Sequence, residues 1–173
     1  MTFSIVARCT RTGQLGMAVS SSSPAVAARC AHAKAGVGVV ASQNITDPRL
    51  GPKTLLAMAE GHSAPEAVKM IINASKNADF RQLLAVDASG NAAIYSGSKS
   101  LGTHADFTSQ NAAAAGNLLA NPNIPEAMVT AFHQGTGHLG DRLIDAMRAA
   151  LALGGEAGAL HSAGLLLVGE QEW

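Results

Sequence analysis

Thr2 is the strongest candidate for a catalytic residue, because it directly follows Met1. Removal of Met1 would leave a free α-amine and a β-hydroxyl on one residue. An N-terminal α-amine has a pKa of about 7.7–8.0, so part of it is neutral at working pH. The neutral amine can take the proton of the hydroxyl and so activate it as a nucleophile. Thr is also a good strand residue, and an ordinary structural role is the alternative.

The other reactive side chains form no pattern typical of catalysis or metal binding. Cys9 and Cys30 lack metal-ligand spacing, and we interpret them as buried free thiols. A nucleophilic role for either cysteine is a remoter alternative, because nothing in the sequence would activate it. The six histidines show no H-E-x-x-H or related spacing. We therefore expect no metal and no cofactor.

Composition favours a single domain over residues 1–173 with a sizeable apolar core. Hydrophobic residues make up 47% of the chain, and charged residues only 14%. The usual charged share is about a quarter, so much of the surface must be small and weakly polar or be covered by another subunit. We therefore expect a homo-oligomer.

Charge and hydropathy patterning exclude several function classes. Twelve basic and twelve acidic residues cancel, and no basic patch with interleaved aromatics supports nucleic-acid binding. The start of the chain lacks a charged segment followed by an apolar run, so no signal peptide is expected. The longest mostly apolar run, Leu160–Val168, is too short to span a bilayer. These features predict a soluble cytoplasmic protein that does not bind membranes.

Stretches with two-residue alternation or buried character predict strands, and stretches with helical spacing predict helices. The predicted strands are Phe3–Arg8, Gln14–Ser21, Gly36–Ser42, Arg81–Val86, Asn91–Ser96, Ala112–Leu119 and Ser162–Val168. The predicted helices are Pro48–Glu60, Ser63–Ser75, Ile124–His133 and Leu139–Leu153. Ser63 and Glu66 carry a capping-box signature. Ala25–Ala33 is a short helix or an irregular connection, and Gly97–Gln110 is predicted to be a polar loop.

The order of these elements indicates an α+β fold rather than an alternating βα fold. Runs of strands are separated by pairs of helices along the chain. Two antiparallel sheets packed face to face, with a helix pair on each outer face, would bury every apolar stripe. We therefore predict a four-layer α-β-β-α sandwich.

Several segments, in their order along the chain, carry a resemblance to a known family. They are Thr2–Arg8, Leu15–Ser21, Ala33–Gln43, Leu50–Lys53, Ala115–Leu119 and His161–Val168. This pattern resembles the domain of unknown function 1028 family over essentially the whole chain. The resemblance implies an N-terminal-nucleophile (Ntn) hydrolase-like fold with no settled reaction. The chain departs from the usual family pattern at Ser22, where a Lys-like group is common, and at His161, where Gln is common.

The resemblance also implies which residues would surround Thr2. Lys34 has the sequence separation from the nucleophile that a lysine has in proteasome-type enzymes, where its charge lowers the pKa of the nucleophile. Backbone N–H groups near Ser42 and Gln43 would form an oxyanion hole, and Asn117 would supply another polar group near the cleft. Ser42, Gln43 and Asn117 are therefore candidate substrate-binding residues. Ser21 is a candidate for substrate binding because it ends the strand beside that of Thr2. Solvation for Lys34, and turn or cap chemistry for the others, are the structural alternatives.

Two hypotheses about function remain open at this point. The first is an amide hydrolase that uses Thr2 after removal of Met1 and acts on a small amide or ureido compound. The second is a non-catalytic oligomeric or small-molecule-binding protein on the same scaffold, with Met1 retained. The mass of the intact protein distinguishes them, since a retained Met1 blocks the α-amine.

Overall fold

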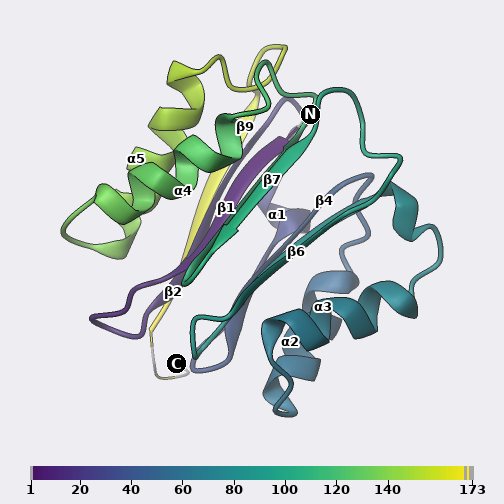
Figure 1. The fold of residues 1–173 in the computed structure, drawn as a ribbon, viewed down its shortest axis with the longest axis vertical. Coiled ribbons are helices and arrows are strands. Elements are labelled where there is room, and N and C mark those ends of the chain that lie inside the picture. Colours follow the sequence, from purple (N-terminus) through teal and green to yellow (C-terminus); the bar gives the residue numbers. More distant parts are fainter. Residues whose placement is uncertain (1, 170, 172–173) are drawn as a thin grey trace.

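A computed structural model describes residues 2–169 and 171 of the chain. Two antiparallel sheets pack face to face, and helices cover the outer face of each sheet (Figure 1). The layers run in the order helices, sheet, sheet, helices, so the predicted α-β-β-α sandwich is confirmed. No helix in the described part of the chain is both long and apolar enough to cross a membrane.

The five-stranded sheet holds the N-terminal strand at its centre. Its strands lie in the order β7 (Ala105–Ser109), β8 (Ala112–Asn117), β1 (Thr2–Arg8), β2 (Leu15–Ser21) and β9 (Ser162–Val168). In the register of β1, Thr2 lies opposite Ser21 on one side and Asn117 on the other. Residues from three distant parts of the sequence therefore meet at the N-terminal end of β1.

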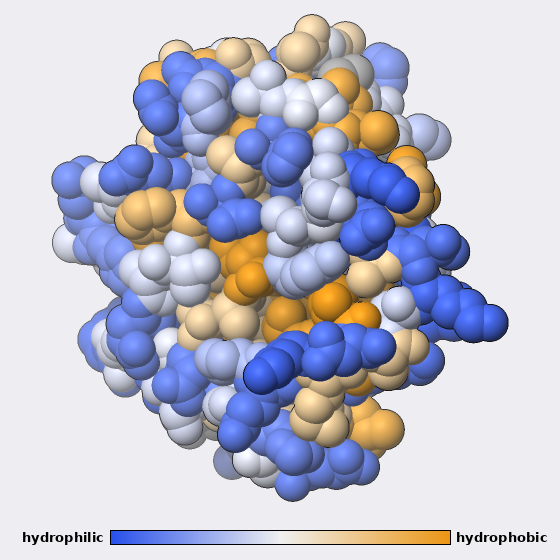
Figure 2. Space-filling view, turned by 45° about the vertical axis from the view of Figure 1, so that its right-hand side comes forward, coloured by the Kyte–Doolittle hydropathy of each residue, from blue (hydrophilic) through white to orange (hydrophobic). Residues whose placement is uncertain are grey.

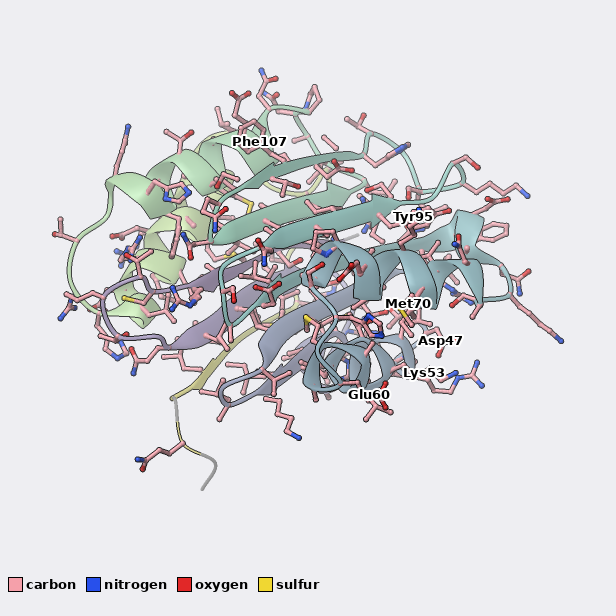
Figure 3. The ribbon with its side chains drawn as sticks, turned by 60° about the horizontal axis from the view of Figure 1, so that its bottom comes forward. Asp47, Lys53, Glu60, Met70, Tyr95 and Phe107 are labelled. Atoms are coloured by element: carbon pink, nitrogen blue, oxygen red, sulfur yellow. The ribbon has the colours of Figure 1, made fainter. Side chains whose placement is uncertain are left out.

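The four-stranded sheet and the helices complete the sandwich. The sheet has the order β3 (Ala31–Lys34), β4 (Gly38–Asn44), β5 (Arg81–Asp87) and β6 (Ala92–Ser96). Helices α2 (Leu50–Ala59) and α3 (Ala64–Asn73) cover this sheet, and α4 (Ile124–Gln134) and α5 (Leu139–Ala152) cover the other. A short helix α1 (Ala27–Cys30) connects β2 to β3, and a 3₁₀ turn (Ala78–Phe80) lies between α3 and β5. In Figure 3, Phe107 lies by α4, whereas Tyr95 lies by α3.

Two strands were missing from the sequence prediction. Gly97–Gln110 was expected to be a loop, but residues Ala105–Ser109 form β7. This strand lies at a sheet edge with one face exposed, so its apolar signal is weak. The second half of Ala25–Ala33 likewise contributes to β3, where alanine gives little strand propensity. The Ser63–Glu66 capping box is confirmed, with the Glu66 carboxylate accepting the Ser63 N–H at 2.8 Å.

Asp87 joins the β5–β6 turn to the start of α3. Its carboxylate accepts backbone N–H groups from Ser89 and Asn91, each at 2.9 Å. It also accepts the N–H of Ala64, in the first turn of α3, and the Asn91 side-chain amide, both at 2.9 Å. Asp87 is buried, and Ala64 is fully buried. Ser89 and Asn91 are exposed, but the buried N–H of Ala64 would be left unsatisfied without the carboxylate, so Asp87 helps to dock α3 on its sheet.

Candidate functional site

The space between the two sheets is apolar along most of its length and polar at one end. Alternate residues of a strand face opposite sides, and Phe3 and Ile5 of β1 contact α4 and α5. Val6 belongs to the core between the sheets, so Thr2 and Ser4 also face the second sheet. The same alternation brings Ser21 and Asn117 to this space from the neighbouring strands. We call this region the polar end of the sandwich.

Thr2 and Ser21 are in direct contact there. Their hydroxyl oxygens lie 3.2 Å apart, and both residues are at least nine-tenths buried. The Ser21 oxygen also accepts the backbone N–H of Ser23 at 3.0 Å. This bond fixes the orientation of the Ser21 side chain, and with it the contact made with Thr2.

A hydrogen-bonded group of amide side chains lines the facing sheet. The Ser4 hydroxyl donates to Gln43 Oε1 at 2.6 Å, and Gln43 Nε2 donates to Gln82 Oε1 at 3.2 Å. Gln82 Nε2 donates in turn to the carbonyl of Gly116 at 3.1 Å. All three side chains are fully buried. The network crosses from one sheet to the other, so it holds the two polar faces in a fixed relation.

Asn117 belongs to the same network from the other side of Thr2. Its Nδ2 donates one hydrogen to Gln82 Oε1 at 2.9 Å, which sets the orientation of the amide. The amide group carries a second hydrogen on the same nitrogen, and this hydrogen can donate to a negatively charged oxygen. Asn117 is directly opposite Thr2 in the sheet, where side chains on the same face lie about 4.5–5.5 Å apart.

Strands β4 and β8 each turn sharply directly after the residue that carries the buried amide, Gln43 in β4 and Asn117 in β8. Asn44 follows Gln43 with φ of 70°, and Leu118 follows Asn117 with φ of 51°. Left-handed backbone is costly for a bulky residue such as Leu and is typical of functional sites. The Leu118 N–H donates to the carbonyl of Leu101 at 2.9 Å, so part of the predicted polar loop lies beside Asn117.

Glu156 is a residue of this region that the sequence reasoning missed. It is 5% exposed, and its Oε2 accepts the backbone N–H of Ser22 at 3.0 Å. Burial raises the pKa of its carboxyl, against the opposing effect of the Ser22 hydrogen bond. The sequence feature that could have indicated it is that Glu156 is the only acidic residue between Asp145 and Glu170.

The predicted site residues fall into two groups in the structure. Ser21, Gln43 and Asn117 lie at the polar end with Thr2. Lys34 does not, because it ends β3 of the other sheet and lies near Val168, at the opposite end of the sandwich from Thr2. The interpretation of Lys34 as a partner of Thr2 is therefore corrected.

The assignment of Ser42 to a substrate site is corrected as well. Ser42 lies one position before Gln43 on β4 and therefore faces α2 and α3 instead of the opposite sheet. Its hydroxyl donates to the carbonyl of Asp47 at 3.0 Å, where it stabilises the connection into α2.

Cys9 and Cys30 lie in the apolar core and not at the polar end of the sandwich. Cys9 and Cys30 are buried and free, as expected, and burial raises the pKa of the Cys30 thiol. A raised thiol pKa makes Cys30 a poor nucleophile at neutral pH. Among the described residues, no group of three His, Cys, Asp or Glu side chains is placed to hold a metal ion.

Comparisons with known proteins place the chain in a family and show its similarity to a solved structure. Residues 2–173 match the model of the family described as "Family of unknown function (DUF1028)". A crystal structure of a protein from Silicibacter pomeroyi, described with the same family model, has a TM-score of 0.89 and 30% sequence identity. The alignment covers 97% of this chain and 76% of the Silicibacter protein. No curated protein matches the sequence.

Proposed function

The chain belongs to the DUF1028 family, and from that premise we propose that it is an Ntn-type amide hydrolase with Thr2 as nucleophile. Removal of Met1 exposes the α-amine of Thr2, which takes the proton of the hydroxyl. The hydroxyl oxygen then attacks a substrate carbonyl carbon and forms a tetrahedral intermediate. As the carbon–nitrogen bond breaks, the α-ammonium returns the proton to the leaving amine. Water, deprotonated by the same amine, cleaves the resulting ester and releases the acid.

The observation that carries this proposal is the position of the Thr2 hydroxyl. It faces the polar end of the sandwich from the first residue of a central strand, 3.2 Å from the Ser21 hydroxyl. An attacking group needs a fixed position and a nearby donor for the developing negative charge. The second hydrogen on Asn117 Nδ2 is our proposed donor, replacing the backbone groups near Ser42 considered from the sequence.

The class of substrate follows from burial. Thr2 is 5% exposed, Asn117 1%, and Ser21 fully buried, so a bulky polymer has little access to these groups. We therefore propose a small amide or ureido compound as the substrate. The neighbouring segment around Leu101 contacts the chain at Leu118 and is suited to cover such a substrate.

The direct test releases the chain from a cleavable fusion in two forms, one beginning at Met1 and one at Thr2. We expect hydrolysis of small amides or ureido compounds only by the form that begins at Thr2. Periodate, which cleaves the 1,2-amino alcohol of an N-terminal Thr, verifies the start by intact mass. Equal activity of both forms would contradict the mechanism. Binding of the same compounds without turnover in either form would favour the non-catalytic alternative.

We also propose that the chain acts in the cytoplasm as one domain that forms a homo-oligomer. Figure 2 shows a face where hydrophobic residues lie between polar ones, in keeping with the 14% charged content. Over β9 and α5, an apolar groove of about 530 Å³ is lined by residues that include Ile144, Leu151 and Leu165. These three side chains are 38%, 50% and 45% exposed. A second copy is the occupant that the charge-poor composition favours.

Leu165→Glu is expected to shift the protein from oligomer to monomer, because it places a charge in this groove. Light scattering coupled to gel filtration measures the change. Leu56→Glu is the matched control, since Leu56 is 60% exposed on α2 over the other sheet. Loss of the oligomer in both variants, or in neither, would count against this surface.

A further inference from the structure

The Glu156 side chain extends across the N-terminal end of β1. In the sheet order, β1 lies between β8 and β2. Glu156 pairs with Leu119, just beyond the end of β8, yet its carboxylate binds the N–H of Ser22, just beyond the end of β2. A carboxylate anchored on one flank and bonded on the other must cross the space in front of Thr2.

Within the described part of the chain, one of the two Glu156 carboxylate oxygens has a hydrogen-bond partner and the other has none. Oε2 accepts the Ser22 N–H, whereas Oε1 is buried and has no hydrogen-bond partner among the described residues. A buried carboxylate oxygen without a donor is costly, and such groups are rare in folded proteins. The Oε1 atom can therefore accept a hydrogen bond, and a cationic donor would compensate the negative charge of the carboxylate best.

The α-nitrogen of Thr2 is the group that the fold directs to this place. Thr2 pairs with Ser21, and β1 and β2 are antiparallel, so the backbone nitrogen of Thr2 lies on the side toward Ser22. We propose that Glu156 is the positioning residue that binds the α-ammonium of Thr2 and stabilises it during proton transfer from the hydroxyl. This inference rests on the function proposed above, because it needs a free α-amine.

The contribution to catalysis is electrostatic. When the amine takes the hydroxyl proton, it becomes an ammonium in a buried place where charge is poorly solvated. A nearby carboxylate favours that charged form and so favours the proton transfer. His161 is a further titratable group near Glu156, and its charge favours the carboxylate form. Its side chain is exposed, with Nδ1 2.8 Å from the Ser22 carbonyl oxygen.

The test measures the pKa of the α-amine directly and needs no substrate. Protein beginning at Thr2 is trace-labelled with isotopic acetic anhydride over a range of pH, and the N-terminal peptide is quantified by mass spectrometry. We expect Glu156→Gln to lower the pKa of this amine by about one unit, because an opposite charge within a few ångströms stabilises the ammonium. Glu156→Asp should give an intermediate value. In active protein, the acidic limb of the kcat/KM profile should shift by the same amount.

Glu60→Gln is the matched control, since Glu60 is exposed at the end of α2. It should leave the pKa of the amine unchanged. An unchanged amine pKa in folded Glu156→Gln and Glu156→Asp proteins would overturn the inference, even if the amide hydrolase activity is found. Conversely, a shifted amine pKa in a protein that hydrolyses no amide would support the contact between Glu156 and the α-ammonium of Thr2. It would refute only the proposed function.

Discussion

Thr2→Ala is expected to lower kcat/KM for amide hydrolysis by at least about 10³-fold, or roughly 4 kcal/mol of transition-state stabilisation. The variant keeps the α-amine but has no oxygen to attack the carbonyl. Thr2→Ser keeps both groups and should stay within about tenfold of the natural protein. Steady-state kinetics on protein released at residue 2 provides the comparison.

Ser20→Ala is the control for a nonspecific effect of losing a hydroxyl at this end of the sheet. Ser20 is buried beside Ser21, but its side chain points to the opposite face, toward α5. We expect a change of no more than about twofold in this variant. If Thr2→Ala kept full activity while folding normally, the nucleophile would have to be sought elsewhere.

Asp87→Ala should lower the free energy of unfolding by about 2–4 kcal/mol, because it removes a carboxylate that accepts four hydrogen bonds, one of them from the buried Ala64 N–H. The N–H groups of Ala64, Ser89 and Asn91 would lose their charged partner together. Asp87→Asn should also destabilise, since an amide presents one acceptor and one donor to a site that supplies only donors. Urea unfolding measures the loss, with the slope of the transition as a check on two-state behaviour.

Asp79→Ala provides the matched comparison for Asp87. The Asp79 side chain is 54% exposed and lies 3.6 Å from the Lys99 ammonium, which is 59% exposed. Exposed ion pairs contribute little, so a change below about 0.5 kcal/mol is expected. Equal stability losses in the two Asp→Ala variants would show that the carboxylate of Asp87 does not anchor α3.

Local patterns were sufficient to predict most of the fold. Strong alternation gave β1, β2 and β5, and the Ser63 capping box placed the start of α3. These patterns involve only residues close together in the sequence, so they can be recognised without the structure. The edge strand β7 and the alanine-rich strand β3 were missed because their own sequence patterns are weak. Each is a strand through its pairing with a neighbour, β8 for β7 and β4 for β3.

The site was harder to predict because its members meet only through long-range pairing. Ser21 could be placed from the hairpin with β1, since their register follows from one short turn. Lys34 was misplaced because no sequence offset tells which end of a sheet a residue will reach. Glu156 was missed for the same reason, as its contact with Ser22 joins parts of the chain that no local pattern connects.

The central position of β1 has a consequence for biosynthesis. Both neighbours of Thr2 are needed to bury it, and one of them, Asn117, is translated long after the first strand. At about 5–20 residues per second, the ribosome reaches Asn117 roughly 6–25 s after starting. Thr2 therefore lacks one of its two flanking strands during this interval, and removal of Met1 is expected to be fastest before β8 pairs with β1. Overproduction that outruns the aminopeptidase is then expected to yield chains that retain Met1 and that lack the proposed hydrolase activity.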